Sequence, residues 1–173
     1  PITIWLTGLS GAGKSTIASE LKTQLARCGQ AACVLDGDAL RRGLNKDLGF
    51  SAEDRSENVR RTAHVARLMN DVGLNAIVAL ISPFRTDRTT ARSAIGIGRF
   101  VEVFVDAPLD ICAARDPKGL YAKAQTGQLP EFTGISSPYE PPEHPDLHLE
   151  TGIIAVEESV IRILNTLRSK WAL

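Results

Sequence analysis

Residues 8–15 have the types and spacing of a loop that cradles the phosphates of a nucleoside triphosphate. They fit the pattern G-x-x-x-x-G-K-[ST]. Glycines let successive backbone N–H groups converge on one anion, Lys14 brings a charge to the β- and γ-phosphates, and the Ser15 hydroxyl is a ligand for Mg²⁺. As a loop residue, Lys14 is expected to be exposed and catalytic. We expect the phosphates of the nucleotide to bind at Gly8, Ser10, Gly11, Ala12, Gly13, Lys14, Ser15 and Thr16.

The alternative for this motif is a glycine-rich turn that binds nothing. Four fixed positions match by chance in roughly one chain in a hundred or fewer. The surroundings reduce that chance further, because an apolar run at residues 2–6 predicts a buried strand and a helical pattern begins near Lys14. The sequence therefore favours a nucleotide-binding site.

Polar side chains follow the next two predicted strands. Asp36 and Asp38 come after the apolar run at residues 31–35, and Ser82 follows the run at residues 75–81. Ligands of open α/β sheets bind where the strands end, so these side chains are expected at the ligand edge. For Asp38, an equally weighted alternative is the N-cap of a short helix that runs through Leu44.

The remaining pattern alternates between strands and helices, which predicts an α/β fold with a parallel sheet of about five strands covered on both faces. Further strands are expected at residues 100–105 and 147–149. The helices are expected at residues 14–29, 38–44, 51–73, 87–95, 109–114 and 155–167.

The helix predicted at residues 51–73 carries both apolar and charged residues. Ser51 and Asp54 are typical of its first turn. Its inner positions are expected to be Val59, Ala63, Ala66 and Leu68. Its first turns hold Arg55, Asn58, Arg60 and Arg61, for which the alternatives are a ligand contact and an ordinary solvated face.

Residues 115–145 break this pattern and are rich in glycine and proline. A turn-rich segment of this length inside a domain is usually functional or disordered. The basic residues Arg115, Lys118 and Lys123, together with Phe132, favour a mobile lid over a linker.

Composition limits the classes of protein that fit. The 173 residues suit a single domain, residues 1–173, and the 20 basic and 20 acidic residues balance, which argues against a nucleic-acid partner. No apolar run approaches the ~20 residues of a membrane span. The three cysteines form no C-x-x-C pair, as expected of free thiols in a reducing, cytoplasmic compartment. Because Pro1 directly precedes the first strand, we expect a domain excised from a longer or bifunctional protein.

Taken together, these pieces resemble the adenylyl-sulfate kinases, P-loop kinases of the nucleotide-kinase type. The resemblance extends over most of the chain, and the pieces beyond the phosphate loop make it specific. They are residues 4–16, 36–38, 47–51, 54–61, 81–83, 116–121, 132–135 and 138–140, with Arg41. The resemblance implies transfer of the γ-phosphate of ATP to the ribose 3′-hydroxyl of adenosine 5′-phosphosulfate (APS), the kinase step of sulfate assimilation.

The resemblance also implies roles for individual residues. Asp38 would bind the 3′-hydroxyl and take its proton, with Asp36 nearer the Mg²⁺. Phe50 and Phe132 would sandwich the adenine of the acceptor, and Arg115 would contact ATP. The other acceptor contacts would be Arg41, Arg55, Asn58, Ile81, Ser82 and Lys118. A homodimer and a fused or associated ATP sulfurylase are the expected partners.

Several alternatives remain open. Ser82 could carry a phosphoserine intermediate, although direct in-line transfer with Ser82 in a positioning role is favoured. Another small-molecule kinase would share the phosphate loop but not the later pieces. A regulatory nucleotide-binding domain could lose Lys14 or Asp38, yet both are present. A GTPase is the weakest alternative because no Asn-Lys-x-Asp signature occurs.

Overall fold

Five parallel strands form the centre of the protein, in the order β2-β3-β1-β4-β5. This computed structural model describes residues 1–171. The strands are β1 (Thr3–Thr7), β2 (Ala32–Asp36), β3 (Asn75–Ala79), β4 (Phe100–Asp106) and β5 (Leu147–Glu150). The predicted α/β fold, with a parallel sheet of about five strands, is confirmed.

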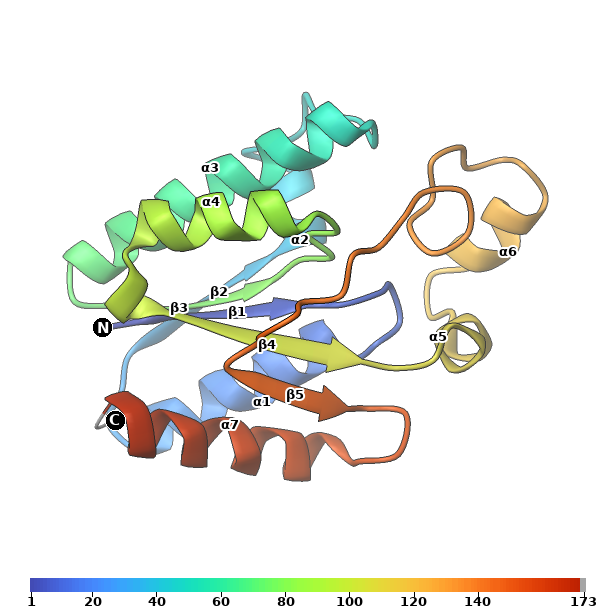
Figure 1. Ribbon diagram of the computed structural model, residues 1–173. Coiled ribbons are helices and arrows are strands. Elements are labelled where there is room, and N and C mark those ends of the chain that lie inside the picture. The colour runs from blue at the N-terminus through green and yellow to red at the C-terminus, as the bar shows by residue number, and fades with distance from the viewer. Residues whose placement is uncertain (172–173) are drawn as a thin grey trace.

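Helices cover both faces of the sheet (Figure 1). One face carries α1 and α7, and the opposite face carries α3 and α4. The helices are α1 (Lys14–Arg27), α2 (Gly37–Arg41), α3 (Ala52–Asp71), α4 (Arg85–Ile95), α5 (Leu109–Arg115), α6 (Leu120–Gln125) and α7 (Val156–Trp171), with a short 3₁₀ turn at Ile97–Arg99.

The central strand β1 shows why its sequence is apolar throughout. Successive side chains of a strand point to opposite faces of the sheet. Ile4 and Leu6 pack into the core beneath α1 and α7, whereas Trp5 packs into the core beneath α3 and α4. Because both faces are covered, none of the three side chains is exposed to solvent.

The start of α2 differs from the sequence prediction. Asp36, not Asp38, is the N-cap, and its carboxylate accepts hydrogen bonds from the backbone N–H groups of Asp38 and Ala39 at 3.0 and 3.3 Å. Either aspartate suits a cap, but β2 ends at Asp36, so the chain turns into the helix there. The Asp38 side chain is therefore free of the capping role.

The prediction for α3 is correct in most respects. The Ser51 hydroxyl accepts a hydrogen bond from the Asp54 N–H at 3.1 Å, so the predicted cap is confirmed. Val59, Ala63 and Ala66 are buried as expected. Leu68 is 66% exposed, and its assignment to the inner face was wrong.

The lid (residues 115–145) extends beyond the carboxyl ends of the strands (Figure 1). It contains the helix α6 and, after it, a turn-rich path that returns toward β5. All three cysteines are free, and Cys112 is buried. Within the described residues, no helix is both long enough and apolar enough to cross a membrane.

Candidate active site

A cavity of about 740 Å³ lies at the carboxyl ends of the strands. The phosphate loop forms one side of it, and α2, α3 and the lid contribute the other. The predicted site residues that line it are Ser10, Gly11, Ala12, Gly13, Lys14, Ser15, Thr16, Asp36, Asp38, Arg41, Phe50, Arg55, Asn58, Ile81, Ser82, Arg115, Lys118 and Phe132. Gly8 is the one predicted residue that does not line the cavity.

Gly8 has a different function in the phosphate loop, which is close packing against the sheet. Its φ is +154°, and a Cβ atom there would lie 2.2 Å from the carbonyl oxygen of Val105. Gly11 is similarly restricted, with a φ of +79° and a would-be Cβ contact of 2.8 Å to the Cys112 carbonyl. No side chain fits at either position without moving backbone, so the loop can hold its shape only with glycine.

The loop leads directly into α1, whose first turn faces the cavity. Gly13 occupies the N-cap in a left-handed conformation and supplies no side-chain cap. The first N–H groups of α1 therefore have no capping side chain, and they are placed at the positive end of the helix dipole. This arrangement is suited to binding a phosphate group.

Lys14 is more enclosed than the sequence suggested. It is only 8% exposed, and its ammonium group donates hydrogen bonds to the carbonyl oxygens of Gly8 and Leu9 at 2.9 and 2.7 Å. Burial lowers the pKa of Lys14 to about 8. The expectation of an exposed lysine was wrong, because the loop wraps around its own side chain.

Ser15 and Asp36 form the part of the site that suits a divalent cation. The Ser15 hydroxyl donates a hydrogen bond of 2.6 Å to the Asp36 carboxylate. In the described residues, no group of three or more His, Cys, Asp or Glu side chains could hold a metal. Mg²⁺ commonly keeps several waters and takes substrate phosphates with one or two protein oxygens, so this pair fits Mg²⁺.

Asp38 forms an ion pair with Lys118 of the lid, and both side chains line the cavity. Both side chains are about half exposed. Nearby, Arg41 donates hydrogen bonds to the carbonyl oxygens of Leu48 and Gly49 at 3.0 and 2.8 Å. A carboxylate and two cations thus meet where α2, the following loop and the lid approach one another.

Phe50 and Phe132 differ strongly in their surroundings. Phe50 is 52% exposed, and the Arg41 guanidinium lies 4.4 Å from the centre of its ring. Phe132 is 8% exposed and packs edge-on against Tyr121, with ring centres 5.0 Å apart. Phe132 is therefore a core residue that also presents part of its surface to the cavity.

Arg55 connects the loops that carry these two aromatic residues. Its Nε donates to the Phe50 carbonyl at 2.9 Å, and its Nη2 donates to the Glu131 carbonyl at 2.7 Å. Burial lowers the pKa of the Arg55 guanidinium, which is nevertheless charged at any physiological pH. Arg55 thereby fixes the spacing between the core side and the lid side of the cavity.

Of the residues in the first turns of α3, some reach the cavity and others lie on the solvated face of the helix. Arg55 and Asn58 are buried against the cavity. Arg60 and Arg61 face away from it and pair with Glu57 at 2.6 and 2.8 Å. The helical repeat separates these residues, so only one stripe of the helix reaches the site.

Ser82 is buried, and its backbone is unusual. Its φ is +41°, which is uncommon for a residue with a side chain. Its hydroxyl oxygen accepts a hydrogen bond of 3.1 Å from the indole N–H of Trp5. An indole N–H is a donor only, so Trp5 cannot take a proton from Ser82.

Two residues that the sequence analysis missed also support the cavity. The Tyr121 hydroxyl donates to the Ser10 carbonyl at 2.8 Å, and Thr151 Oγ1 donates to the Ala12 carbonyl at 2.7 Å. Arg115 adds bonds to the carbonyls of Gly11 and Thr151 at 3.3 and 2.7 Å. The end of β5 at the same sheet edge was a signal for Thr151, whereas nothing local indicated Tyr121.

Comparison with known proteins agrees with this geometry. Residues 1–150 match the protein family described as Adenylylsulphate kinase. An adenylyl-sulfate kinase of Paraburkholderia xenovorans is 58% identical over 161 residues, which are 93% of this chain and 89% of that protein. The chain belongs to the adenylyl-sulfate kinase family.

Other similar proteins are longer than this chain or have solved structures. The chain is 60% identical to the bifunctional enzyme NodQ of Rhizobium tropici, but the match spans only 24% of that enzyme and 87% of this chain. The APS kinase CysC of Mycobacterium tuberculosis, in complex with AMPPNP and APS, is 48% identical with a TM-score of 0.93, covering 96% of this chain and 97% of that one. A gluconokinase of Sinorhizobium meliloti, at 18% identity and a TM-score of 0.64, shares the fold alone.

Proposed function

We propose how the site serves the reaction of this adenylyl-sulfate kinase, which makes 3′-phosphoadenosine 5′-phosphosulfate and ADP from ATP and APS. The observation that carries the proposal is the single cavity that joins the phosphate loop to Asp38 and the two aromatic residues. A donor phosphate on the loop and an acceptor hydroxyl at Asp38 could then meet in one enclosure. Phosphoryl transfer depends mainly on such positioning and on neutralising charge.

The phosphate loop would hold ATP. The first N–H groups of α1 and the Lys14 ammonium face the region where the phosphates would lie. Lys14 would exchange its bonds to the Gly8 and Leu9 carbonyls for bonds to the β- and γ-phosphates. Ser15 and Asp36 would hold Mg²⁺, which neutralises phosphate charge when bound. Arg115, held on the Gly11 carbonyl, would add positive charge on the lid side.

Asp38 would bind the 3′-hydroxyl of APS and accept its proton. Since Asp36 caps α2, the carboxylate of Asp38 is available for this chemistry. A carboxylate is a weak base toward an alcohol, but it suffices when most proton movement follows P–O bond breaking in a loose transition state. Ser82 would position the acceptor, and the phosphoryl group would pass directly from ATP.

The acceptor would lie between α3 and the lid. Arg41, Arg55, Asn58 and Lys118 would face its phosphosulfate and ribose, because planar guanidinium groups and ammonium groups suit oxyanions. Phe50 and Phe132 would enclose the adenine, with Ile81 along the same wall. Lid closure over this region would exclude water as a competing acceptor.

We also propose that the protein acts as a homodimer or larger oligomer and works with an ATP sulfurylase. Support comes from relatives named as bifunctional enzymes and from a hexameric APS kinase of Thiobacillus denitrificans. Light scattering on the purified protein would measure the mass of the assembly, and a monomer at micromolar concentration would contradict the oligomer.

The decisive test of the reaction is ADP release from ATP with different acceptors. APS should support turnover, whereas AMP, nucleosides and gluconate should not. The matched control is Lys14→Ala, which removes one transition-state charge contact and should lower the rate at least about a hundredfold. ADP release that is equal with gluconate would favour a different small-molecule kinase, and near-normal release by Lys14→Ala would remove the phosphate loop from the mechanism.

A further inference from the structure

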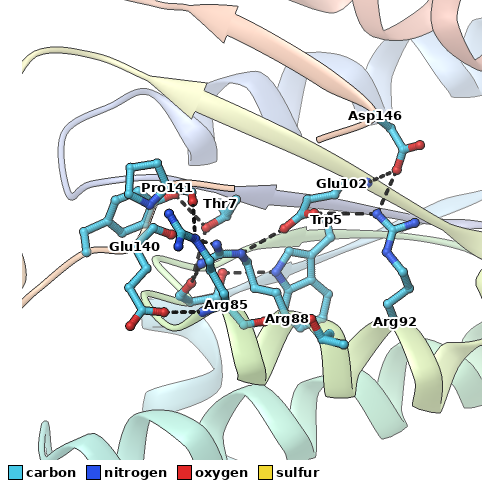
Figure 2. A network of polar contacts seen from close by, with 12 residues as sticks. Trp5, Thr7, Arg85, Arg88, Arg92, Glu102, Glu140, Pro141 and Asp146 are labelled. Atoms are coloured by element: carbon cyan, nitrogen blue, oxygen red, sulfur yellow. Dashed lines mark hydrogen bonds and ion pairs between the residues drawn. The ribbon is translucent and has the colours of Figure 1, made fainter. Parts of the chain in front are cut away.

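Arg88 is the centre of a buried polar network outside the cavity wall (Figure 2). It lies on α4 and is only 3% exposed. Its Nε donates to Glu102 Oε1 at 2.8 Å, its Nη1 to the Ser82 carbonyl at 2.7 Å and its Nη2 to the Glu140 carbonyl at 2.7 Å. One guanidinium group thus connects β4, the turn after β3 and the part of the lid that carries Glu140.

The first of these connections holds the turn that carries Ser82. With a φ of +41°, Ser82 has a conformation that persists only when its surroundings enforce it. Three side chains do so. Arg88 binds its carbonyl and Trp5 binds its hydroxyl. Thr7 Oγ1 donates to the preceding Ile81 carbonyl at 2.7 Å and to the Ser82 carbonyl at 3.4 Å. Of these donors, Arg88 is the one that brings a charge.

The second connection holds the segment where the lid returns to the sheet. The Glu140 N–H donates to the Pro83 carbonyl at 2.9 Å, and the Glu140 carboxylate accepts from the Arg85 N–H at 2.8 Å. The side chain of Arg85 also donates to the Pro141 carbonyl at 2.7 Å, as Figure 2 shows. Residues 82–85 and 140–141 therefore form one bonded unit, and Arg88 donates a hydrogen bond to each of the two segments.

The chemistry of this position requires arginine. A buried cation needs a counter-charge, which Glu102 supplies with a side chain that is only 12% exposed. The three acceptors of Arg88 lie in different directions, and the planar fork of a guanidinium reaches them together, whereas an ammonium group at the end of a flexible stem does not. A lysine could keep the pair with Glu102 but would lose at least one carbonyl.

We propose that Arg88 is a positioning residue for the acceptor half of the site, holding the Ser82 turn and the Glu140 end of the lid as one unit. The proposal rests on the proposed roles of Ser82 and the lid in binding APS. Loss of Arg88 should therefore affect the acceptor more than the phosphate loop, because none of its hydrogen bonds goes to that loop.

The test compares Arg88→Lys with Arg92→Lys. Arg92 lies one turn further along α4 and pairs with Glu102 and Asp146 at 3.6 and 3.0 Å, but it donates to neither Ser82 nor Glu140. Both variants are made in a Trp171→Phe background, which leaves Trp5 as the single tryptophan. We expect Arg88→Lys to raise the KM for APS about tenfold or more, with the KM for ATP changed less than about twofold.

Trp5 provides the second readout, because its indole N–H binds the Ser82 hydroxyl. Arg88→Lys should shift the Trp5 emission in the direction that Ser82→Ala shifts it, and Arg92→Lys should not. The double variant Arg88→Met/Glu102→Leu removes both buried charges, so no unpaired charge is left to prevent folding. It still lacks the hydrogen bonds that Arg88 donates to the Ser82 and Glu140 carbonyls. It should show the same increase in KM and the same emission shift.

A folded Arg88 variant with wild-type KM for APS, or with unchanged Trp5 emission, would overturn the proposal, even if its unfolding temperature were lower. That result would make Arg88 a purely stabilising residue. A wild-type protein that fails to use APS would instead contradict the proposed function itself, so the two failures are distinguishable.

Discussion

Lys118 of the lid forms an ion pair with Asp38 at the start of α2, and both side chains line the cavity. The two residues are 80 positions apart in the sequence. The carboxylate proposed to accept the proton is thus already engaged by a lid cation before an acceptor binds. An incoming 3′-hydroxyl must share the Asp38 carboxylate with Lys118 or displace the Lys118 ammonium from it.

Asp38→Asn should lower kcat at least about a hundredfold and leave ATP affinity nearly unchanged. The amide keeps the shape of the side chain but cannot accept the proton, and general-base groups typically contribute ~10²–10⁴ in rate. Helix α2 should be intact because Asp36 is its cap. Single-turnover ADP formation and equilibrium ATP binding measure the two effects. Asp47→Asn, in a surface pair with Arg61, is the matched control. Equal losses of rate and ATP affinity would argue against a role in proton transfer.

Ser82→Ala should keep measurable turnover. If Ser82 only positions the acceptor, the variant loses about one hydrogen bond, roughly 0.5–3 kcal/mol of transition-state stabilisation. It also leaves the Trp5 N–H without its partner, so the unfolding temperature should fall. A covalent mechanism requires an inactive variant, and it requires labelled phosphate on Ser82 when the wild type meets ATP without acceptor. Mass spectrometry of that mixture distinguishes the covalent mechanism from direct transfer.

Phe132→Ala should weaken APS binding by ~1–3 kcal/mol, the range for one lost base stack, with a much smaller effect on ATP. Because Phe132 is buried against Tyr121, the variant should also unfold at a lower temperature. Phe50→Ala separates these effects, since Phe50 is 52% exposed. It should weaken APS binding with little loss of stability. Titrations with APS and with ATP measure both affinities. If Phe132→Ala weakened the two equally, Phe132 would pack the lid in general and would not contact the acceptor specifically.

ATP binding should take up a proton when the pH is near or above 8. Burial lowers the pKa of Lys14 to about 8 in the ligand-free protein, so a growing fraction is neutral as the pH rises through that value. The phosphates favour the charged form and raise this pKa on binding. Calorimetry at about pH 8.5 should give a binding heat that depends on the buffer, whereas at about pH 6 Lys14 is already charged and contributes no uptake. Lys14→Met should abolish the uptake, and a buffer-independent heat for the wild type at the higher pH would refute it.

Some parts of the site follow from short stretches of sequence. The phosphate loop needs only its glycines, Lys14, Ser15 and the strand and helix on either side, because consecutive residues build it. The α/β class follows from the alternation of apolar runs with helical periods. The N-cap of α3 at Ser51 could also be predicted from the local sequence, since its partner Asp54 is only three residues away.

Choices between neighbouring candidates were less predictable. Asp36 and Asp38 have the same chemistry, and only the point where β2 leaves the sheet assigns the cap to Asp36. Leu68 was assigned to the wrong face of α3, because at 3.6 residues per turn it lies about half a turn away from the buried Val59, and it is exposed. The burial of Lys14 depends on how the loop folds around it.

The sequence by itself determined the fold class, the phosphate loop and the residues gathered at the sheet edge, because local patterns encode strands, helices and turns. Only the tertiary structure decided the pairing of Lys118 with Asp38, of Tyr121 with Ser10, and the triple contact of Arg88. Such contacts join residues that are far apart in the chain. Their geometry depends on strand order and helix packing, and no local pattern of residue types specifies either.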